Sequence, residues 1–229
     1  MTSRQNYVTQ NLFPVRCWAF QASEELTDAT LEAAKAVDYR SYNTDEMQGG
    51  GTGTTDDIQT LEAFRPAMEW IQKCVDTLHF DNGWCCDRLI INKAWCNQAR
   101  AGAGHHHIPH RHPMSYLSSV FYLTDGAPTI FLDPVDKREW GQLHLDGGPN
   151  LDCQYHYHGG PGGLIFFPSY MVHGSAPHYE EDIDRFSIAA NVFPQGDINM
   201  GGWQRPMVNI PKVRGWEILG PLPLKDYKR

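Results

Sequence analysis

The stretch that decides the fold lies near the middle of the chain. Residues 110–123 read HRHPMSYLSSVFYL, an H-x-H pair followed by a run rich in aliphatic and aromatic side chains. Such a run favours a β-strand. Side chains two residues apart point to the same face of an extended segment, so His110 and His112 can bind one metal ion together.

A third ligand is expected from a second apolar run farther along the chain. Residues 164–167 (LIFF) lead into PSYMVH, which ends at His173. If the two strands are neighbours, His173 reaches the same ion as the first pair. Imidazole suits Fe, Zn, Cu and Ni. An H-x-H pair alone is weak evidence, but with F-P-S-x-x-x-H about 60 residues later it indicates a three-histidine metal site.

The next strand carries a cation on the same face as small polar side chains. Arg185, Ser187, Ala189 and Asn191 alternate along the run RFSIAANVF. A guanidinium buried beside a metal site requires an anionic partner, and its planar fork matches a carboxylate. The alternative is a surface ion pair with Asp182 or Asp184.

Further strands are expected on both sides of this motif. They are short and are separated by Gly, Pro and Asp, which is typical of an antiparallel sandwich or barrel. The expected strands cover residues 89–91, 116–123, 129–132, 154–157, 164–167 and 186–193.

The N-terminal third has the spacing of helices instead. Residues 24–38 form one candidate, and a stripe of apolar residues at steps of three and four forms a second: Leu61, Phe64, Met68, Ile71, Val75 and Leu78. We expect a single mainly β domain over 1–229. Helical support over about 24–80 covers one outer face, the strand core spans about 88–193, and 194–229 form an extended tail.

Composition excludes several classes of protein. The 229 residues carry a formal charge of −8, which argues against a nucleic-acid surface. No apolar run approaches the roughly 20 residues needed to span a bilayer. Residues 1–20 lack the pattern of a signal peptide. We therefore expect a cytoplasmic protein with its six cysteines reduced.

Together these motifs resemble a known family. H-x-H-P, LSSVFYL, FLDP, G-x-x-x-F-P-S-x-x-x-H and RFSIAAN are similar to those of the 2-oxoglutarate/Fe(II)-dependent dioxygenases. The resemblance covers about residues 11–193 and is strongest to a branch of putative 2OG-Fe(II) oxygenases common in phage and marine bacterial genomes. If the chain is phage-encoded, the expected location is the host cytoplasm. It implies a double-stranded β-helix, or jelly roll.

The resemblance also implies roles for particular residues. His110, His112 and His173 would bind Fe(II). Arg185 and Ser187 would bind the distal carboxylate of 2-oxoglutarate, Tyr122 would add a phenol hydrogen bond to it, and Asn191 would be a pocket-wall amide. Most of the family has a carboxylate where this chain has His112, and Asp133 is an alternative carboxylate ligand.

The implied reaction consumes O2 and 2-oxoglutarate, hydroxylates a C–H bond of a small-molecule or peptide substrate, and yields succinate and CO2. A prolyl hydroxylase is one candidate. The alternatives are a cupin-type three-histidine metalloenzyme that does not use 2-oxoglutarate, and a non-catalytic jelly-roll binding protein. Arg185 and Ser187 argue against the first, and the three histidines together with Arg185 argue against the second.

Other segments receive weaker interpretations. Residues 48–54 and 136–160 are candidate lids, and Trp140 and Tyr155 are candidates for a substrate groove. The triplet His105–His107 is expected to be a solvated turn. His156 and His158 repeat the H-x-H spacing, which a strand with outward imidazoles explains equally well.

Overall fold

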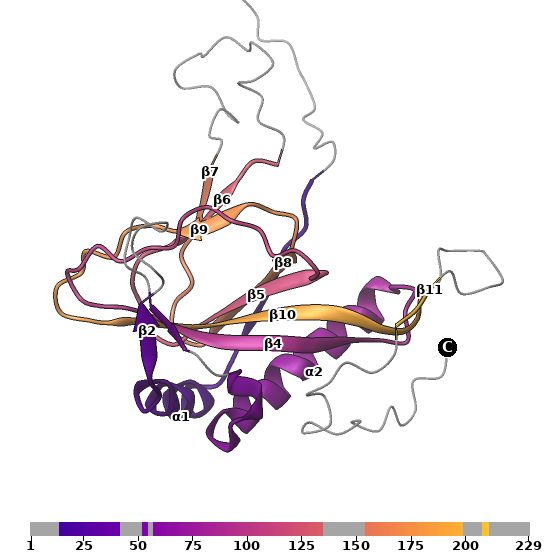
Figure 1. Ribbon diagram of the computed structural model, residues 1–229, viewed down its shortest axis with the longest axis horizontal. Helices are drawn as coiled ribbons and strands as arrows, with labels where there is room; N and C mark the ends of the chain where they lie inside the picture. Colours follow the sequence, from indigo (N-terminus) through magenta and orange to yellow (C-terminus); the bar gives the residue numbers. More distant parts are fainter. Residues whose placement is uncertain (1–13, 42–51, 55–56, 135–153, 199–207, 211–229) are drawn as a thin grey trace, which may run out of the picture.

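The computed structural model describes residues 14–41, 52–54, 57–134, 154–198 and 208–210. Within these residues the strands form two antiparallel sheets (Figure 1). The large sheet has the order β1 (Trp18–Gln21), β8 (Gly163–Pro168), β5 (Leu117–Tyr122), β10 (Arg185–Ile198), β4 (Arg88–Ala99), β3 (Thr52–Thr54) and β2 (Tyr39–Ser41), and β11 (Val208–Ile210) pairs with β10. The small sheet has the order β7 (Gln154–Tyr157), β6 (Thr129–Leu132) and β9 (His173–Ser175).

The segment 105–110 extends the small sheet beside β9. His110 and His173 exchange backbone hydrogen bonds of 2.8 and 3.0 Å, and His105 pairs with His178. From β4 onward the chain therefore passes from the large sheet to segment 105–110, back to β5, across to β6 and β7, back to β8, across to β9 and back to β10. This alternation between two facing sheets is the jelly roll, and the expected fold class is confirmed.

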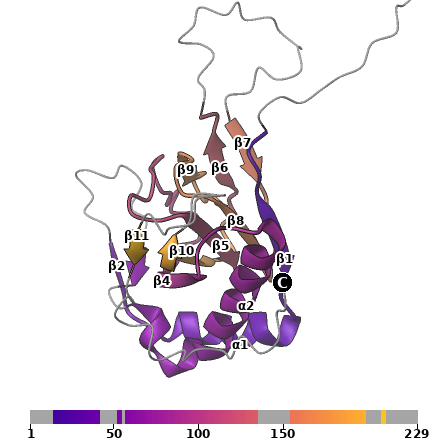
Figure 2. The same cartoon turned by 90° about the vertical axis from the view of Figure 1, so that its right-hand side faces the viewer.

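Two helices lie under the large sheet, on the face away from the small sheet (Figures 1 and 2). α1 (Glu24–Lys35) begins after Ser23, whose side chain accepts a hydrogen bond from the Leu26 N–H. α2 (Arg65–Asn82) follows two short 3-10 turns, Ile58–Thr60 and Glu62–Phe64, and has Pro66 in its first turn. Gly83 ends α2 in the left-handed region, with φ of 59°. In the described part of the chain, no helix is long and apolar enough to cross a membrane.

Side-chain alternation along the large sheet separates two cores. On β8, Leu164 and Phe166 join the helix-side cluster, whereas Ile165 and Phe167 pack between the sheets. The same alternation on β10 sends Phe186 and its i+2 neighbours toward the helices. The opposite face of β10 is therefore available to the space between the sheets, where Arg185 and Ser187 lie.

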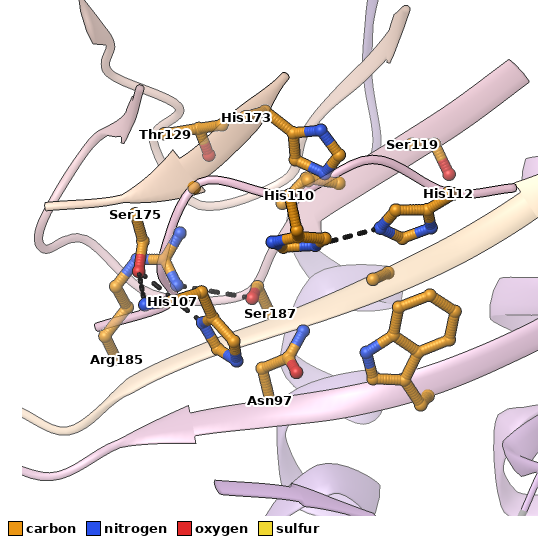
Figure 3. Close-up of a pocket in the computed structure, with 14 residues that line it drawn as sticks. Asn97, His107, His110, His112, Ser119, Thr129, His173, Ser175, Arg185 and Ser187 are labelled. Atoms are coloured by element: carbon orange, nitrogen blue, oxygen red, sulfur yellow. Dashed lines mark hydrogen bonds between the residues drawn. The ribbon is translucent and has the colours of Figure 1, made fainter. Parts of the chain in front are cut away.

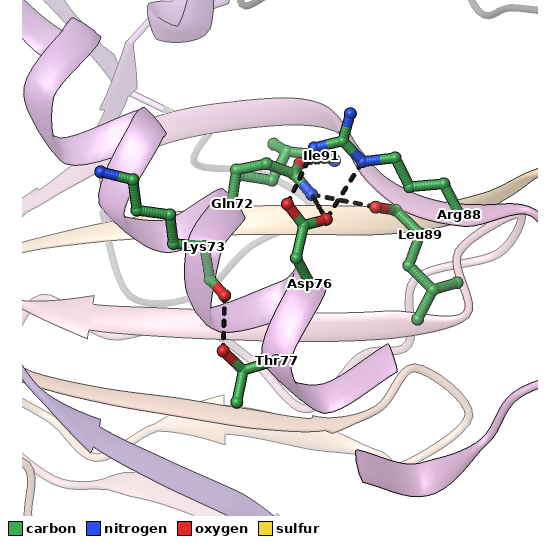
Figure 4. Close-up of polar contacts among 7 residues, drawn as sticks. All are labelled: Gln72, Lys73, Asp76, Thr77, Arg88, Leu89 and Ile91. Atoms are coloured by element: carbon green, nitrogen blue, oxygen red, sulfur yellow. Dashed lines mark hydrogen bonds and ion pairs between the residues drawn. The ribbon is translucent and has the colours of Figure 1, made fainter. Parts of the chain in front are cut away.

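Polar side chains join α2 to the edge of β4 (Figure 4). The buried Gln72 donates to the Leu89 carbonyl at 3.0 Å and accepts from the Ile91 N–H at 3.1 Å. Arg88 binds the Asp76 carboxylate through two nitrogens, at 2.8 and 3.1 Å. Among the described residues β3 pairs with β4 only at Asn97 and Gln98. The contacts with α2 therefore satisfy backbone groups at the other end of β4, where no described strand pairs on this side.

Some predicted boundaries differ from the structure. β10 continues to Ile198, so residues 194–198 belong to the large sheet and not to an extended tail. Residues 52–54 of the predicted loop form β3. Residues 48–51, 136–153, 199–207 and 211–229, with Trp140 among them, lie outside the described residues.

Five of the six cysteines fall in the described residues, and none of these five forms a disulfide: Cys17, Cys74, Cys85, Cys86 and Cys96. Burial raises the pKa of the Cys74 and Cys96 thiols to about 12, so both stay protonated at neutral pH. This agrees with the expectation of reduced thiols. Cys153 lies outside the described residues.

Candidate metal centre and co-substrate pocket

Three histidines converge on one point between the sheets (Figure 3). A ligand nitrogen from each of His110, His112 and His173 lies within 4.8 Å of the other two. The Nε2 atoms of His110 and His112 are 3.0 Å apart. Two imidazole nitrogens that bind one ion at about 2.1 Å and at right angles are separated by about 3 Å, so the spacing fits a shared divalent ion.

The other ring nitrogen of each histidine faces an oxygen acceptor. His110 Nδ1 lies 2.7 Å from the Ile108 carbonyl, and His173 Nδ1 lies 3.0 Å from the Met171 carbonyl. His112 Nδ1 lies 2.5 Å from Oδ1 of Asn191. A carbonyl or amide oxygen can only accept, so each Nδ1 donates its proton, and the Nε2 lone pairs are left for the ion.

The backbone around the histidines is shaped by two local features. A Cβ on Gly174 would lie 2.5 Å from the His107 carbonyl oxygen, so glycine is needed for segment 105–110 to approach β9. On β4, Asn92 is an extra residue opposite the step from Asn191 to Val192. Such a bulge re-aims nearby side chains, and Asn191 at this point reaches His112.

Burial keeps the histidines neutral. Desolvation lowers the pKa of His173 to about 3, and it also lowers the pKa of His112. Neutral imidazoles are the form that binds metals, and three of them fit Fe(II) as well as other late divalent ions. In the described part of the chain Asp133 is not a member of this group, so the geometry favours the three-histidine set over the carboxylate alternative.

One pocket is lined both by the three histidines and by Arg185. The Arg185 side chain is buried, and its Nε donates to the Ala127 carbonyl at 2.8 Å while Nη1 contacts Ser187 Oγ at 3.4 Å. In the described residues it forms no ion pair with a carboxylate. Asp184, a suggested surface partner, instead accepts from Gln98 and from the Ala101 N–H.

Two of the predicted site residues, Tyr122 and Asn191, contact residues that line the pocket but do not line it themselves. Tyr122 is buried with its hydroxyl 2.6 Å from Thr129 Oγ1, and its ring lies 5.5 Å from the Arg185 guanidinium carbon. Thr129 lines the pocket, whereas Tyr122 and Asn191 are not among its lining residues. Asn191 therefore contacts a metal ligand instead of forming the expected pocket wall, and Tyr122 supports Arg185 and Thr129.

Several lining residues were not predicted, among them Trp95, Asn97, His107 and Thr129. The triplet His105–His107 is not a solvated turn, because it belongs to the segment that pairs with β9 and the residues after it. Burial is the main cause that lowers the pKa of His107 to about 4. In contrast, Tyr155 is 66% exposed on β7 and does not line the pocket. His156 and His158 are exposed, as an outward-facing strand requires.

Comparison with known families agrees with this geometry. The family described as "Putative 2OG-Fe(II) oxygenase" matches residues 93–191. That segment contains the three histidines and Arg185. The resemblance expected from the sequence motifs is therefore confirmed over these residues. The sequence has no match among curated protein sequences.

Solved structures share the fold at low sequence identity. The epimerase SnoN, solved in complex with Fe3+, alpha ketoglutarate and nogalamycin RO, superposes with a TM-score of 0.60 at 12% identity, covering 88% of this chain and 92% of that one. A Pseudomonas putida prolyl-4-hydroxylase gives 0.56 at 14% identity, over 80% and 94% of the two chains. HygX from Streptomyces hygroscopicus, with nickel, 2-oxoglutarate and hygromycin B bound, gives 0.53 at 10%, over 87% and 94%.

The family match and the three-histidine group agree with the expected cofactors, Fe(II) and 2-oxoglutarate with O2 as co-substrate. The similar structures include an epimerase as well as a prolyl hydroxylase, so what they share with this chain is the fold.

Proposed function

We propose that the protein oxidises a C–H bond of an organic substrate with Fe(II), 2-oxoglutarate and O2, releasing succinate and CO2. The observation that carries the proposal is a single pocket with three converging histidine nitrogens at one end and a buried arginine without a carboxylate partner in the described residues at the other. A dicarboxylate that binds a metal through one end and presents a free carboxylate at the other fits both ends of this pocket.

Arg185 and Ser187 would hold the distal carboxylate. A guanidinium has five N–H donors, and the described contacts of Arg185 to protein use only its Nε and Nη1 nitrogens. The remaining N–H groups can form the parallel pair of bonds that a carboxylate accepts, with the Ser187 hydroxyl as a further donor. The Ala127 carbonyl fixes the guanidinium plane before the ligand arrives.

His110, His112 and His173 would hold the iron. When bound, the iron would supply the redox chemistry by which O2 oxidises 2-oxoglutarate and the substrate. The Nδ1–H bonds to Ile108, Met171 and Asn191 fix the ring orientations. Three neutral ligands leave the full double positive charge on the ion, which favours a dianionic co-substrate at the same place. Packed aromatic side chains exclude water behind the site, since the rings of Phe167 and His173 lie 4.6 Å apart.

Hydroxylation is the reaction type we favour, and a prolyl residue is one candidate substrate. Support comes from the similar fold of a prolyl-4-hydroxylase. The same support extends to other chemistry, because SnoN is an epimerase. The substrate class is therefore argued below from residues of this chain alone.

A turnover assay tests the proposal. Purified protein with Fe(II), 2-oxoglutarate, air and ascorbate should form succinate, because ascorbate supplies the two electrons that the C–H bond of the substrate would otherwise provide. Removal of Fe(II), 2-oxoglutarate or air should stop it. His173→Ala should abolish the activity because a ligand nitrogen is lost, while His156→Ala, at an exposed imidazole on β7, should leave it unchanged. Succinate formation that does not need added metal would contradict the proposal.

A further inference from the structure

Two side chains of β4 face the pocket and have no part in the proposed binding of iron or 2-oxoglutarate. Ala94 and Cys96 belong to the helix-side core, so Trp95 and Asn97 point to the opposite face, between the sheets. Both residues line the pocket. The inference about their ligand rests on the proposed function, because that ligand is the molecule that would be oxidised at this site.

Trp95 provides a flat surface directly beside a metal ligand. Its ring is stacked on that of His112, with centroids 5.4 Å apart and planes inclined by 23°. The side chain is only half-buried, so part of the indole remains open to the pocket. A ring placed on this surface would lie next to the metal centre, which is the position required of a substrate.

Asn97 offers a hydrogen-bonding group at the same wall. The residue is 8% exposed, yet its buried Oδ1 has no hydrogen-bond partner in the described residues. Figure 3 shows the Asn97 amide beside His107 and below Ser187, at the wall of the pocket that β4 forms. A buried polar oxygen without a partner is costly, and rotation of the amide would turn it toward a donor on a ligand in the pocket.

The neighbourhood of Asn97 leaves room for such a ligand. On β3, Gly53 is directly opposite Asn97 and has no side chain to cover it. The only lining residue of the described pocket that carries a permanent charge is Arg185, which the co-substrate would engage. A group bound between Trp95 and Asn97 therefore meets neither a carboxylate nor an ammonium, which favours an uncharged ligand.

We propose that Trp95 and Asn97 bind the primary substrate, and that its bound part is a neutral saturated ring with an N–H or O–H donor beside it. The C–H face of the ring packs on the indole, and the donor bonds to Asn97 Oδ1. A prolyl residue followed by a peptide N–H has this chemistry, and so does the hydroxyl-bearing ring of a glycoside.

Binding measurements on the full chain, loaded anaerobically with Fe(II) and 2-oxoglutarate, test this assignment. The probes are N-acetylproline methylamide and a methyl glucoside, followed by ligand-detected NMR. At least one probe should bind the wild type. Trp95→Leu keeps an apolar side chain but removes the flat face, so it should weaken binding at least about 10-fold, whereas Trp95→Phe should stay within about 3-fold.

Asn97→Ala should weaken the same probe about 5- to 10-fold, because the acceptor is lost. Affinity for 2-oxoglutarate should change less than about 2-fold in all these variants. Trp84→Phe serves as the matched control, since Trp84 packs on Trp18 and Tyr116 and does not line the pocket.

Binding of the proline probe alone identifies a peptide substrate, and binding of the glucoside alone identifies a sugar-bearing molecule; both support the proposal. It is overturned if neither probe binds the wild type, or if Trp95→Leu binds them unchanged. It is also overturned if Asn97→Ala weakens 2-oxoglutarate as much as the probe. Failure of the wild type to bind 2-oxoglutarate is a separate result, which contradicts the proposed function itself.

Discussion

At the scale of single residues, the site depends on hydrogen bonds that fix which nitrogen of each histidine is free. Two of the three acceptors are backbone carbonyls, which no substitution removes. The third is the side chain of Asn191, whose Oδ1 lies 2.5 Å from His112 Nδ1. Asn191 is therefore the one point where side-chain chemistry alone controls the orientation of a metal ligand.

Replacing Asn191 with Ala should weaken metal binding about 10- to 100-fold, because His112 loses the acceptor that fixes its ring. Competitive titration with Co(II) measures the effect. Asn82→Ala, at the end of α2 and away from the pocket, should bind the metal like the wild type. Equal affinity in the Asn191 and Asn82 variants would show that the His112–Asn191 bond does not orient the ligand.

The sequence was sufficient to predict residues whose role follows from their spacing within one segment. It was not sufficient for residues whose role depends on how distant segments pack together. Spacing within one extended segment was enough to pair His110 with His112. Nothing in the sequence around Asn97 or Thr129 shows that either faces a pocket, because that depends on the register of strands far apart in the chain. Asn191 was assigned to the correct strand face, but its partner could not be foreseen without the bulge at Asn92.

At the scale of elements, the position of His173 relative to His110 is set by the close approach of β9 and segment 105–110. Gly174 permits this approach, since a Cβ there would meet the His107 carbonyl at 2.5 Å. The edge of β4 is held in place by a side chain of α2. Gln72 donates a hydrogen bond to the Leu89 carbonyl and accepts one from the Ile91 N–H.

Gly174→Ala should separate the two segments and reduce both stability and metal affinity. We expect a loss of about 1–3 kcal/mol in the free energy of unfolding, because a backbone carbonyl cannot move away as a flexible side chain would. Urea denaturation and Co(II) titration report the two effects. Gly160→Ala is the control, since a Cβ there has Asp125 Oδ1 at 3.7 Å as its nearest neighbour. Equal behaviour of the two variants would contradict the role of Gly174.

Gln72→Leu should lower the free energy of unfolding by about 1–3 kcal/mol, because buried backbone groups of Leu89 and Ile91 lose their partners. Metal affinity should stay unchanged, since Gln72 is on the helix side of the large sheet. The same replacement at the exposed Lys73 of α2 should change stability by less than about 0.5 kcal/mol. If Gln72→Leu is as stable as the wild type, water must satisfy the Leu89 carbonyl and the Ile91 N–H in place of Gln72.

Elements with a clear pattern were predicted closely. β6 and β7 have the predicted bounds, and four residues of the predicted helical stripe are buried on α2: Met68, Ile71, Val75 and Leu78. Two of the strands that were missed, β3 and β9, lack such a pattern. β9 has three residues, and β3 lies in a glycine-rich stretch, so each is a strand only because a neighbouring segment pairs with it.

At the scale of the whole molecule, burial of neutral histidines makes the metal-free protein sensitive to acid. The pKa of His107 is about 4 and that of His173 about 3 in the folded state, both below the usual value of 6.5, and burial is the main cause. The unfolded chain therefore binds more protons below pH 6.5, so the free energy of unfolding must fall as the pH decreases.

Between pH 6.5 and 5 we expect a loss of up to about 2 kcal/mol for each of these two histidines. Urea denaturation of metal-free protein at several pH values measures it. His107→Gln should flatten the dependence, whereas His156→Gln, at an exposed position, should not. A stability that is constant or that rises on acidification to pH 5 would contradict the burial of neutral imidazoles.

The central claim is that one pocket joins a three-histidine metal centre to an arginine that binds 2-oxoglutarate. Calorimetric titration of 2-oxoglutarate into the anaerobic, Fe(II)-loaded full chain tests it most directly. Arg185→Lys keeps the charge but loses the planar fork, so the dissociation constant should rise at least about 10-fold, equivalent to about 1.4 kcal/mol. Arg185→Ala should weaken binding further while leaving iron affinity nearly unchanged. Wild-type affinity for 2-oxoglutarate in the Arg185→Ala variant would contradict the claim.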